Sequence, residues 1–221
     1  IYYTAFANAQ WSWTPALTII AIITMVFGSL VAIAQRDVKR MLAYSSIAHA
    51  GFLLTGVIAL NKAGLEATLF YLFAYGITTV GAFAIVTLVR DSAGEVTDLN
   101  RWKGLGKRSP WVATAFAGFL LSFAGIPLTS GFIGKFSIFS AAYESGATSV
   151  VIAGVLSSAI AAFFYIRVIV LMFFTDPVED GTSVEIPSSL TSITVIFSMV
   201  VTIALGVFPA PVLTFISNLA T

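Results

Sequence analysis

The sequence contains no cysteine and a single histidine, and only 10% of its 221 residues are charged. Without cysteine, the chain forms no disulfide and offers no thiolate ligand for zinc or an iron–sulfur cluster. Soluble domains carry about 25% charged residues, so this composition excludes an ordinary soluble protein. The net charge of +1 gives no basic surface for nucleic acid. The sequence also has no phosphate-binding loop, metal-ligand cluster or catalytic triad.

Hydrophobic residues instead make up 58% of the chain, and the mean hydropathy is +0.98. This composition predicts an all-α polytopic membrane protein in which residues 1–221 form a single membrane domain. Runs of about 20 apolar residues, the length that a bilayer requires, predict six transmembrane helices. They are expected at residues 14–35, 41–60, 65–89, 111–143, 148–174 and 188–208.

Both ends of the chain carry interfacial features. Residues 1–13 are aromatic and uncharged, which is typical of a membrane–water interface and not of a signal peptide. Pro209 and Pro211 end the last predicted helix, and a short interfacial tail is expected after them. Because the first residue is Ile1 and not methionine, we expect this chain to be a piece of a longer one.

The positive charges predict an orientation in the membrane. One side of the predicted topology carries nearly all of them, and the other side carries only Lys62. The positive-inside rule therefore places loops 36–40, 90–110 and 175–187 in the cytoplasm and both ends of the chain outside. The basic residues behind this assignment are Arg36, Lys39, Arg40, Arg90, Arg101, Lys103, Lys107 and Arg108.

The fourth predicted span contains a break between Gly125 and Gly131. Pro127 has no backbone N–H, and its ring clashes with the carbonyl of Phe123 if the helix continues. A carbonyl freed in this way must find a partner inside the protein or in a water-filled cavity. The segment is therefore predicted to form a broken membrane helix, a feature that often accompanies an ion or proton path.

Lys135 follows this break in the middle of the predicted span. A lysine at the centre of a membrane helix costs roughly 2.5–3.5 kcal/mol, and such residues usually serve function. The alternative is a lysine that extends to the headgroups. Lys135 is nine residues before Glu144, which is roughly 13 Å along a helix. This depth favours a proton-translocating role.

The single histidine, His49, lies in the second predicted span, one turn after Ser45. Histidine can accept and release protons near physiological pH, so His49 is a candidate relay. The alternative is a histidine that serves helix packing by bonding to a neighbouring carbonyl. A lysine elsewhere in the same bundle favours the relay.

Other polar residues in the spans have weaker indications. Arg167 lies near the cytoplasmic end of its helix and Glu144 near the outer end, so both are predicted to be structural or interfacial charges. Hydroxyl side chains in the spans are candidates for holding water or relaying protons, although such groups also serve ordinary helix contacts. These candidates are Ser45, Ser122, Thr129 and Ser130.

Two segments carry a resemblance to a known family. They read KRMLAYSSIAH at residues 39–49 and DLNRWKGLGKRSP at residues 98–110, and the second leads into AGIPLTSGFIGKF at residues 124–136. The chain resembles subunit N of proton-pumping NADH–quinone oxidoreductase, respiratory complex I, over nearly all of its length. The histidine in SSIAH and the DLNRWKGLGKRSP lead-in favour subunit N over its antiporter-like paralogues, one of which usually has glutamate where Lys135 stands.

The resemblance implies a fold of about fourteen helices with two inverted five-helix repeats. This chain would supply the last six helices, with residues 14–174 as the second repeat and residues 188–221 as the final helix and tail. Lys135 matches the lysine of the second broken helix, and His49 matches the histidine of a central polar axis that couples quinone reduction to proton movement. The chain itself would hold no cofactor, because FMN, iron–sulfur clusters and quinone belong to partner subunits.

The resemblance implies other membrane-arm subunits as partners, in a bacterial plasma membrane or an organellar inner membrane, with the lipid bilayer around them and no nucleic acid. Two alternatives remain open on the sequence. The chain can belong to a multisubunit Na⁺/H⁺ antiporter without NADH chemistry, because that family shares the motifs. It can also be a structural helix bundle in which Lys135 is paired and inert.

Overall fold

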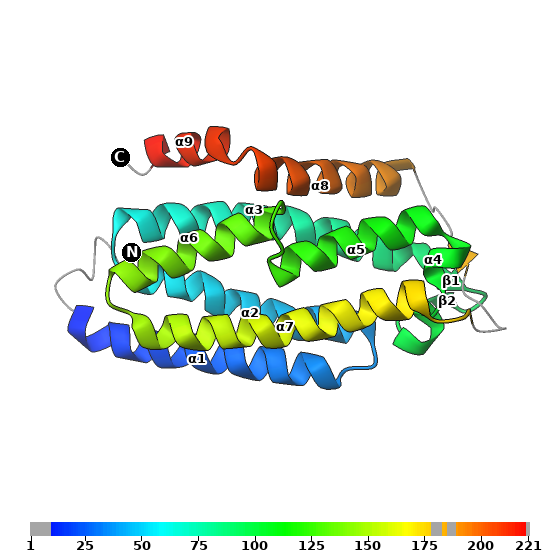
Figure 1. Ribbon diagram of the computed structural model, residues 1–221, viewed down its shortest axis with the longest axis horizontal. Coiled ribbons are helices and arrows are strands. Elements are labelled where there is room, and N and C mark those ends of the chain that lie inside the picture. Colours follow the sequence, from blue (N-terminus) through cyan, green and yellow to red (C-terminus); the bar gives the residue numbers. More distant parts are fainter. Residues whose placement is uncertain (1–9, 178–182, 185–188, 220–221) are drawn as a thin grey trace.

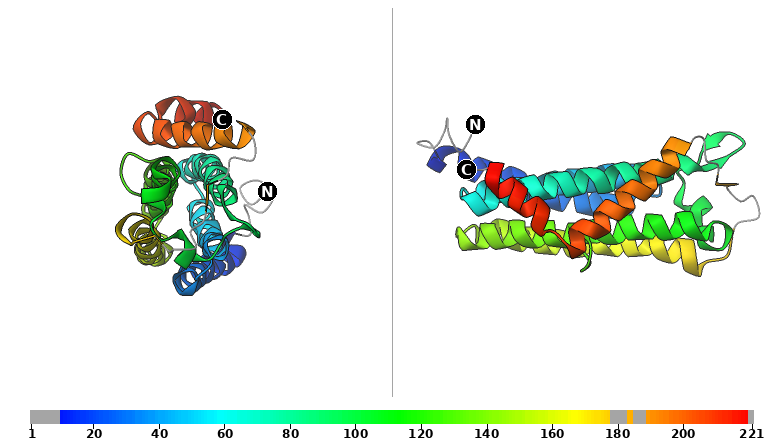
Figure 2. Two further views of the ribbon diagram at one scale, coloured as in Figure 1. Left: turned by 90° about the vertical axis from the view of Figure 1, so that its right-hand side faces the viewer. Right: turned by 90° about the horizontal axis from the view of Figure 1, so that it is seen from above.

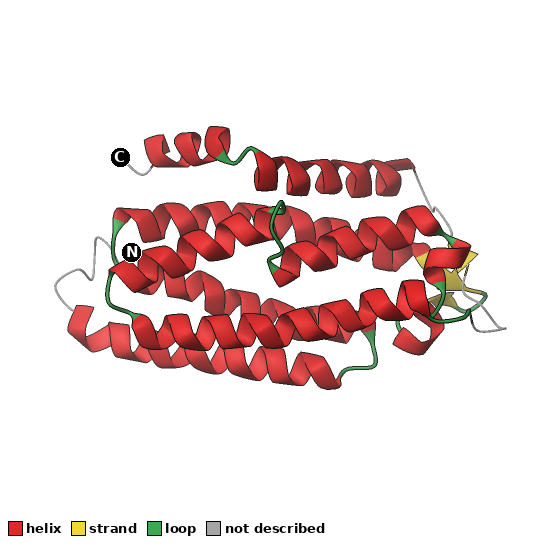
Figure 3. Cartoon of the chain, in the orientation of Figure 1, coloured by secondary structure: helices red, strands yellow, loops and turns green. Residues whose placement is uncertain are grey.

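The computed structural model describes residues 10–177, 183–184 and 189–219, and these residues are mostly helical (Figures 1 and 3). Most of the expected interfacial segment 1–13 and part of loop 175–187 fall outside the described residues. The main helices are α1 (Gln10–Ala34), α2 (Val38–Ile58), α3 (Lys62–Leu88), α5 (Pro110–Ala124), α6 (Ser130–Glu144), α7 (Thr148–Phe174) and α8 (Ser189–Val207). Shorter helical segments are η2 (Leu99–Trp102), α4 (Leu105–Arg108) and α9 (Ala210–Leu219).

Five of these helices are long and apolar enough to cross a membrane, namely α1 from Trp13 onwards, α2, α3, α7 and α8. The prediction of a helical protein with several spans is confirmed to this extent, and α7 has the predicted ends. Helices α5 and α6 have only 15 residues each. At 1.5 Å per residue each is roughly 22 Å long, shorter than the hydrocarbon core of about 30 Å.

Short connections between the first three helices are fixed by polar caps. Asp37 accepts a hydrogen bond from the backbone N–H of Arg40 at 2.9 Å, and Asn61 accepts one from Gly64 at 2.7 Å. Each cap satisfies a backbone donor that the first turn of a helix leaves free. The chain therefore reverses after α1 and again after α2, and the three helices lie antiparallel in sequence order (Figure 1).

The helices are arranged in a bundle with an added layer. Helix α1 packs against α2 and α7, and α3 packs against α6 and α8. Viewed along the bundle, α8 and α9 form a separate layer above α3, α5 and α6 (Figure 2). The end of α8 packs tightly on the connection between α5 and α6, because a Cβ on Gly206 would lie 2.5 Å from the carbonyl carbons of Leu128 and Thr129.

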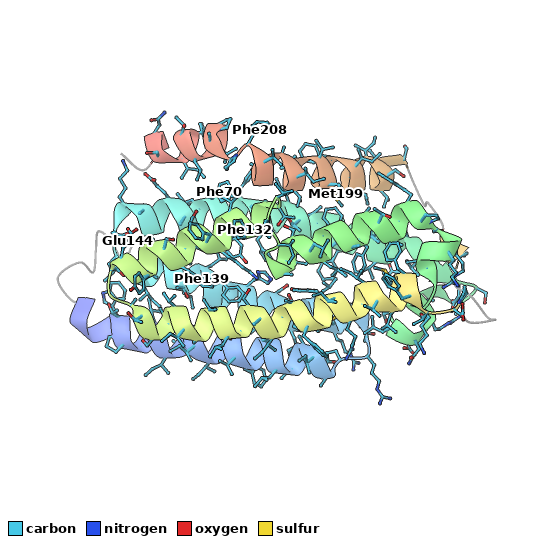
Figure 4. The ribbon with its side chains drawn as sticks, in the orientation of Figure 1. Phe70, Phe132, Phe139, Glu144, Met199 and Phe208 are labelled. Carbon is cyan, nitrogen blue, oxygen red and sulfur yellow. The ribbon has the colours of Figure 1, made fainter. Side chains whose placement is uncertain are left out.

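Residues 210–219, expected as part of a short tail, form the helix α9. Helix α9 packs against α3, and its buried Ile216 belongs to a cluster with Phe70, Ala74 and Leu205. Figure 4 shows Phe70 beneath this layer and Phe208 at the junction of α8 and α9. The end of the described chain therefore contributes apolar contacts to the bundle.

Two large apolar clusters fill the bundle, and the candidate site lies where they meet. One contains Phe123 and Tyr165 together with much of α5. The other contains Phe52 and Tyr71, with residues of α1 and α6. The His49 ring contacts members of both clusters, since its centroid lies 5.6 Å from that of Phe123 and 5.4 Å from that of Phe52.

The segment 90–110, predicted as a long hydrophilic loop, is folded. Strand β1 (Val89–Asp91) pairs antiparallel with β2 (Gly94–Glu95) and with β3 (Ser183–Val184), which places β1 in the centre of a three-stranded sheet. Arg90 lies opposite Glu95 in one pair and opposite Ser183 in the other. This small sheet is an exception to the predicted all-α fold.

A buried tryptophan anchors the rest of this segment. The Trp102 indole N–H donates to the carbonyl of Val96 at 2.8 Å, and the ring packs against Phe116 of α5. We call the end of the bundle that holds residues 35–37, 89–109 and 175–177 the loop end. Basic side chains there contact carboxylates, in the pairs Lys39–Glu95, Arg101–Asp91 and Lys107–Asp176.

Candidate functional site in the helix bundle

Helix α5 ends at the predicted glycine. Gly125 has a φ of +83°, and its N–H donates to the carbonyls of Leu121 and Ser122 at 3.1 and 3.0 Å. The next N–H, from Ile126, also turns back to Leu121 at 3.0 Å. Glycine adopts this left-handed conformation without the steric cost of a Cβ. The helix is therefore already finished before Pro127, which lies exposed in the connection.

Helix α6 starts against the side of α5. The Gly131 N–H donates to the Ser122 hydroxyl at 3.2 Å, and the Ser122 and Ser130 hydroxyls lie 3.4 Å apart. Thr129 donates locally to the carbonyl of Ile126 at 2.7 Å. Ser122 and Ser130 thus join the two helix ends, while the role predicted for these hydroxyls in water binding or proton relay stays a prediction.

Lys135 of α6 reaches back to the end of α5. Its side chain is only 5% exposed, and its ammonium nitrogen lies 2.7 Å from the carbonyl oxygen of Phe123, one of the carbonyls that the end of α5 leaves free. It also donates to Ala124 at 3.4 Å and to the hydroxyl of Ser158 at 2.9 Å. The internal partner that the Phe123 carbonyl requires is therefore the lysine itself.

The ammonium group is held by dipoles and not by an opposite charge. Among the described residues no carboxylate lies within ion-pair distance of Lys135. The carboxyl end of α5 carries partial negative charge, which stabilises a cation placed there. The Phe52 ring adds a cation–π contact, with the nitrogen 4.9 Å from the ring centroid. This arrangement holds a positive charge without neutralising it.

A cavity of about 280 Å³ lies beside Lys135, between α6 and α7. Gly125 and Ser158 contribute to its wall near the ammonium group, and the rest of the wall is mostly apolar. Figure 4 shows two of its lining residues, Phe132 and Phe139, along α6. The ammonium group therefore has space into which it can move.

His49 lies in a buried group of hydroxyl-bearing side chains. Its Nδ1 atom lies 2.5 Å from the Tyr71 hydroxyl and its Nε2 atom 3.3 Å from the Tyr165 hydroxyl. Tyr165 in turn is hydrogen-bonded to Ser45, and the imidazole ring stacks on Tyr75 at a centroid distance of 4.3 Å. Both ring nitrogens of His49 thus have hydroxyl partners, on α3 and on α7.

Two of the residues around His49 could not be related to it from the sequence. Tyr165 was not singled out, because its neighbours in α7 are apolar and nothing local relates it to His49. Phe52, one turn after His49, was not singled out either. Tyr71 and Tyr75 are four residues apart in one predicted span and therefore share one face of its helix. The sequence thus indicates a polar face on this helix, although not that it faces His49.

His49 and Lys135 share aromatic neighbours but have no direct hydrogen bond in the described structure. The Phe52 ring contacts both, and Phe123 contacts the histidine with its ring and the lysine with its carbonyl. The space between His49, Tyr71 and Phe123 has no room for a water molecule. Among the described residues, no chain of hydrogen-bonded side chains links the two groups.

Arg167 lies away from this group and holds the end of α1. Its guanidinium donates to the carbonyls of Ile33 at 2.9 Å and Gln35 at 2.7 Å. These carbonyls belong to the last turn of α1 and the residues after it, where backbone acceptors have no helical partner. Glu144 is the last residue of α6 and is exposed.

The role of Arg167 leads to a stability prediction. We expect Arg167→Met to lower the free energy of unfolding by about 1.5–3 kcal/mol, because the charged hydrogen bonds to Ile33 and Gln35 are lost. The measurement is thermal unfolding in detergent. Lys62→Ala is the control, since it removes an exposed ion pair with Glu66 at 3.7 Å, and such pairs contribute about 0–1 kcal/mol. Equal melting temperatures for the two variants would contradict the capping role.

Comparison with known proteins identifies the family. The model of the NADH:quinone oxidoreductase/Mrp antiporter transmembrane family matches residues 2–161. The chain belongs to this family. It is 59% identical over 209 residues to NADH-quinone oxidoreductase subunit N of Rhodococcus opacus, covering 95% of this chain and 39% of that protein. It is 55% identical over 215 residues to subunit N of Thermobifida fusca, covering 96% of this chain and 39% of that protein.

Solved structures of this family share the fold. A chain of respiratory complex I from Thermus thermophilus has a TM-score of 0.79 and 33% identity, covering 90% of this chain and 45% of that one. A chain of the Mrp complex from a Dietzia species has a TM-score of 0.86, covering 100% of this chain and 49% of that one, but is only 23% identical, so it shows the fold alone. The resemblance to subunit N is confirmed, and the chain spans about 39% of the length of both curated relatives. Family membership and the five apolar helices make it an integral membrane protein.

Proposed function

We propose that this chain is part of a proton-translocating membrane-arm subunit of an NADH–quinone oxidoreductase. The observation that carries the proposal is the buried Lys135 ammonium, held by the free carbonyls at the end of α5 with no carboxylate partner among the described residues. Buried charges in membrane helices are costly and usually mark a proton or ion path. The subunit N relatives supply the class of complex.

Lys135 is the main proton-binding residue in this proposal. When it carries the proton, the carboxyl end of α5 and the Phe52 ring stabilise the charge. When the proton leaves, the neutral amine still donates to the Phe123 carbonyl, so the backbone does not lose its partner. The cavity beside Lys135 gives the side chain space to change its contacts between the two states.

His49 acts as a relay. Its two ring nitrogens face the hydroxyls of Tyr71 and Tyr165, so a proton can enter on one side and leave on the other. Transfer between His49 and Lys135 is controlled by Phe52 and Phe123, because water enters between them only when these rings move. Quinone reduction elsewhere in the complex drives that movement.

The proposed topology has six spans. Helices α5 and α6 together form the fourth span, broken between Gly125 and Gly131, so that Lys135 lies in mid-membrane. Residues 14–174 form the second five-helix repeat of an antiporter-like subunit, and residues 188–221 the final helix and tail. Loops 36–40, 90–110 and 175–187 face the cytoplasm of a bacterium, and both ends of the chain lie outside.

The chain works without a redox centre of its own in this proposal. FMN, the iron–sulfur clusters and quinone bind to other subunits, and the partners of this chain are the neighbouring membrane-arm subunits, including its paralogues. A subunit of a Na⁺/H⁺ antiporter is the second candidate, because the matching family includes both NADH:quinone oxidoreductases and Mrp antiporters. It would use the same lysine without NADH oxidation.

A native gel distinguishes the two candidates. Source membranes are solubilised in mild detergent, separated, stained for NADH oxidation and probed for this chain. We expect the chain to migrate with the NADH-oxidising band, and to disappear from it when its gene is deleted. Migration in a large band without NADH oxidation would replace the proposal with the antiporter.

A further inference from the structure

A second cavity opens at the loop end, beside the first turns of α2. Its volume is about 630 Å³, more than twice that of the cavity beside Lys135. It starts where α1 ends and α2 begins, and both helices are long and apolar enough to cross a membrane. Its lining residues are Gln35, Arg40, Ala43, Tyr44 and Ile47.

At the end of the cavity nearest the start of α2, Arg40 supplies a positive charge that is not paired with a carboxylate among the described residues. Arg40 is exposed, and its guanidinium has no ion-pair or hydrogen-bond partner among the described residues. The nearby carboxylate of Asp37 is already used, because it accepts the backbone N–H of Arg40 and the hydroxyl of Thr97. The exposed guanidinium of Arg36 likewise has no partner within the described ranges.

Three other basic side chains at the loop end differ in this respect. Lys39, Arg101 and Lys107 each contact a carboxylate of the same loops. The charges of Arg36 and Arg40 are therefore not needed to hold the loop end together. They remain available for an anionic ligand.

Further along α2 the cavity is lined by apolar residues, and exposed apolar residues of α1 lie next to it. Ile47 of α2 is 37% exposed, and Phe27 and Leu30 of α1 are 54% and 51% exposed. The Phe27 ring meets the edge of Tyr44 at a centroid distance of 6.4 Å, which brings the apolar face of α1 up to the cavity. Ala43, which also lines the cavity, has a small side chain that does not fill it.

We propose that this cavity binds an anionic phospholipid. The phosphate lies against Arg40, with Arg36 adding positive charge nearby, and one acyl chain follows Ala43, Ile47 and Phe27 into the bilayer. Guanidinium groups bind phosphate oxygens through paired hydrogen bonds, and basic pockets between membrane helices suit anionic headgroups. A lipid matches both halves of the cavity, whereas a polypeptide would have to bring a carboxylate and an apolar face at this spacing.

The test places a photo-crosslinker in this cavity, in a chain that is part of the assembled complex. Ile47→p-benzoylphenylalanine reports the lipid in the cavity, and Ile196→p-benzoylphenylalanine on α8 reports bulk lipid, since Ile196 is 48% exposed at a similar distance from the loop end of its helix. Complexes in nanodiscs of phosphatidylcholine and phosphatidylglycerol are illuminated. Mass spectrometry then gives the ratio of anionic to zwitterionic lipid adducts at each position.

We expect a higher ratio of anionic adducts at position 47 than at position 196. Each arginine near the membrane surface contributes about fivefold to binding of anionic lipid, so Arg36→Ala with Arg40→Ala should lower the ratio at position 47 up to about 25-fold. Lys107→Ala should leave it unchanged, because Lys107 is paired with Asp176. Equal ratios at 47 and 196 in the unaltered chain would overturn the proposal, as would an adduct to polypeptide at position 47.

Discussion

A Gly131→Ala variant is expected to fail to assemble a stable bundle. At this position α6 begins against α5, and an added Cβ would overlap the carbonyl oxygen of Ser122 and lie 2.7 Å from its carbonyl carbon. These are backbone atoms and cannot rotate away, so the two helices must separate. Separation also breaks the hydrogen bond from the Gly131 N–H to the Ser122 hydroxyl. We expect a cost above about 3 kcal/mol, beyond the usual range for overpacking.

The control for this variant is Gly76→Ala. Gly76 lies in α3, where a Cβ would meet nothing within 4 Å, and alanine favours a helix over glycine by about 1 kcal/mol. The amount of assembled complex and its melting temperature are measured for both variants. Gly76→Ala should be at least as stable as the unaltered chain, and a Gly131→Ala complex as stable as the unaltered chain would show that α5 and α6 are not joined as described.

A Lys135→Met variant is expected to lose at least about 100-fold of its proton transport, the lower end of the effect of a positioned proton-transfer group. Methionine keeps most of the apolar stem of the side chain but removes the ammonium group. The carbonyls of Phe123 and Ala124 then lose their donor, which costs about 1–3 kcal/mol for a buried acceptor. Proton uptake driven by NADH oxidation in inverted vesicles, normalised to assembled complex, measures the loss.

Ser158→Ala is the matched control for Lys135→Met. It removes one partner of the ammonium, at 2.9 Å, and leaves both carbonyl contacts and the charge in place. We expect a much smaller loss of proton transport than for Lys135→Met. If both variants pumped normally once assembled, Lys135 would be a structural residue and the scaffold alternative would hold.

Local sequence signals sufficed for the long helices and for where α5 stops. Hydropathy marked the five apolar helices, and α7 begins and ends at the predicted residues. The group Gly125, Pro127 and Gly131 marked the stop, although the glycine turn ends the helix before the proline is reached. The sequence also indicated that the Phe123 carbonyl needs a partner, but not that Lys135 supplies it, because that pairing depends on how α6 folds back on α5.

Contacts between distant segments were not predictable in this way. Tyr165 reaches His49 across 116 positions of the chain, and helical periodicity in α7 says nothing about which helix it will face. The small sheet was missed for a similar reason. Its strands have two or three residues, and β3 comes from a loop far along the chain, so no strand pattern was long enough to recognise.

Lys135→Arg distinguishes a Lys135 side chain that takes up and releases a proton from one that only supplies a fixed positive charge. Arginine keeps the positive charge and can donate to the carbonyls at the end of α5, and the adjoining cavity gives it space, but a guanidinium does not deprotonate in proteins. The measurement is the number of protons translocated per NADH oxidised by the assembled variant. We expect an assembled complex that translocates clearly fewer protons per NADH oxidised. An unchanged ratio would show that a fixed positive charge is enough and would contradict the proton-carrying role.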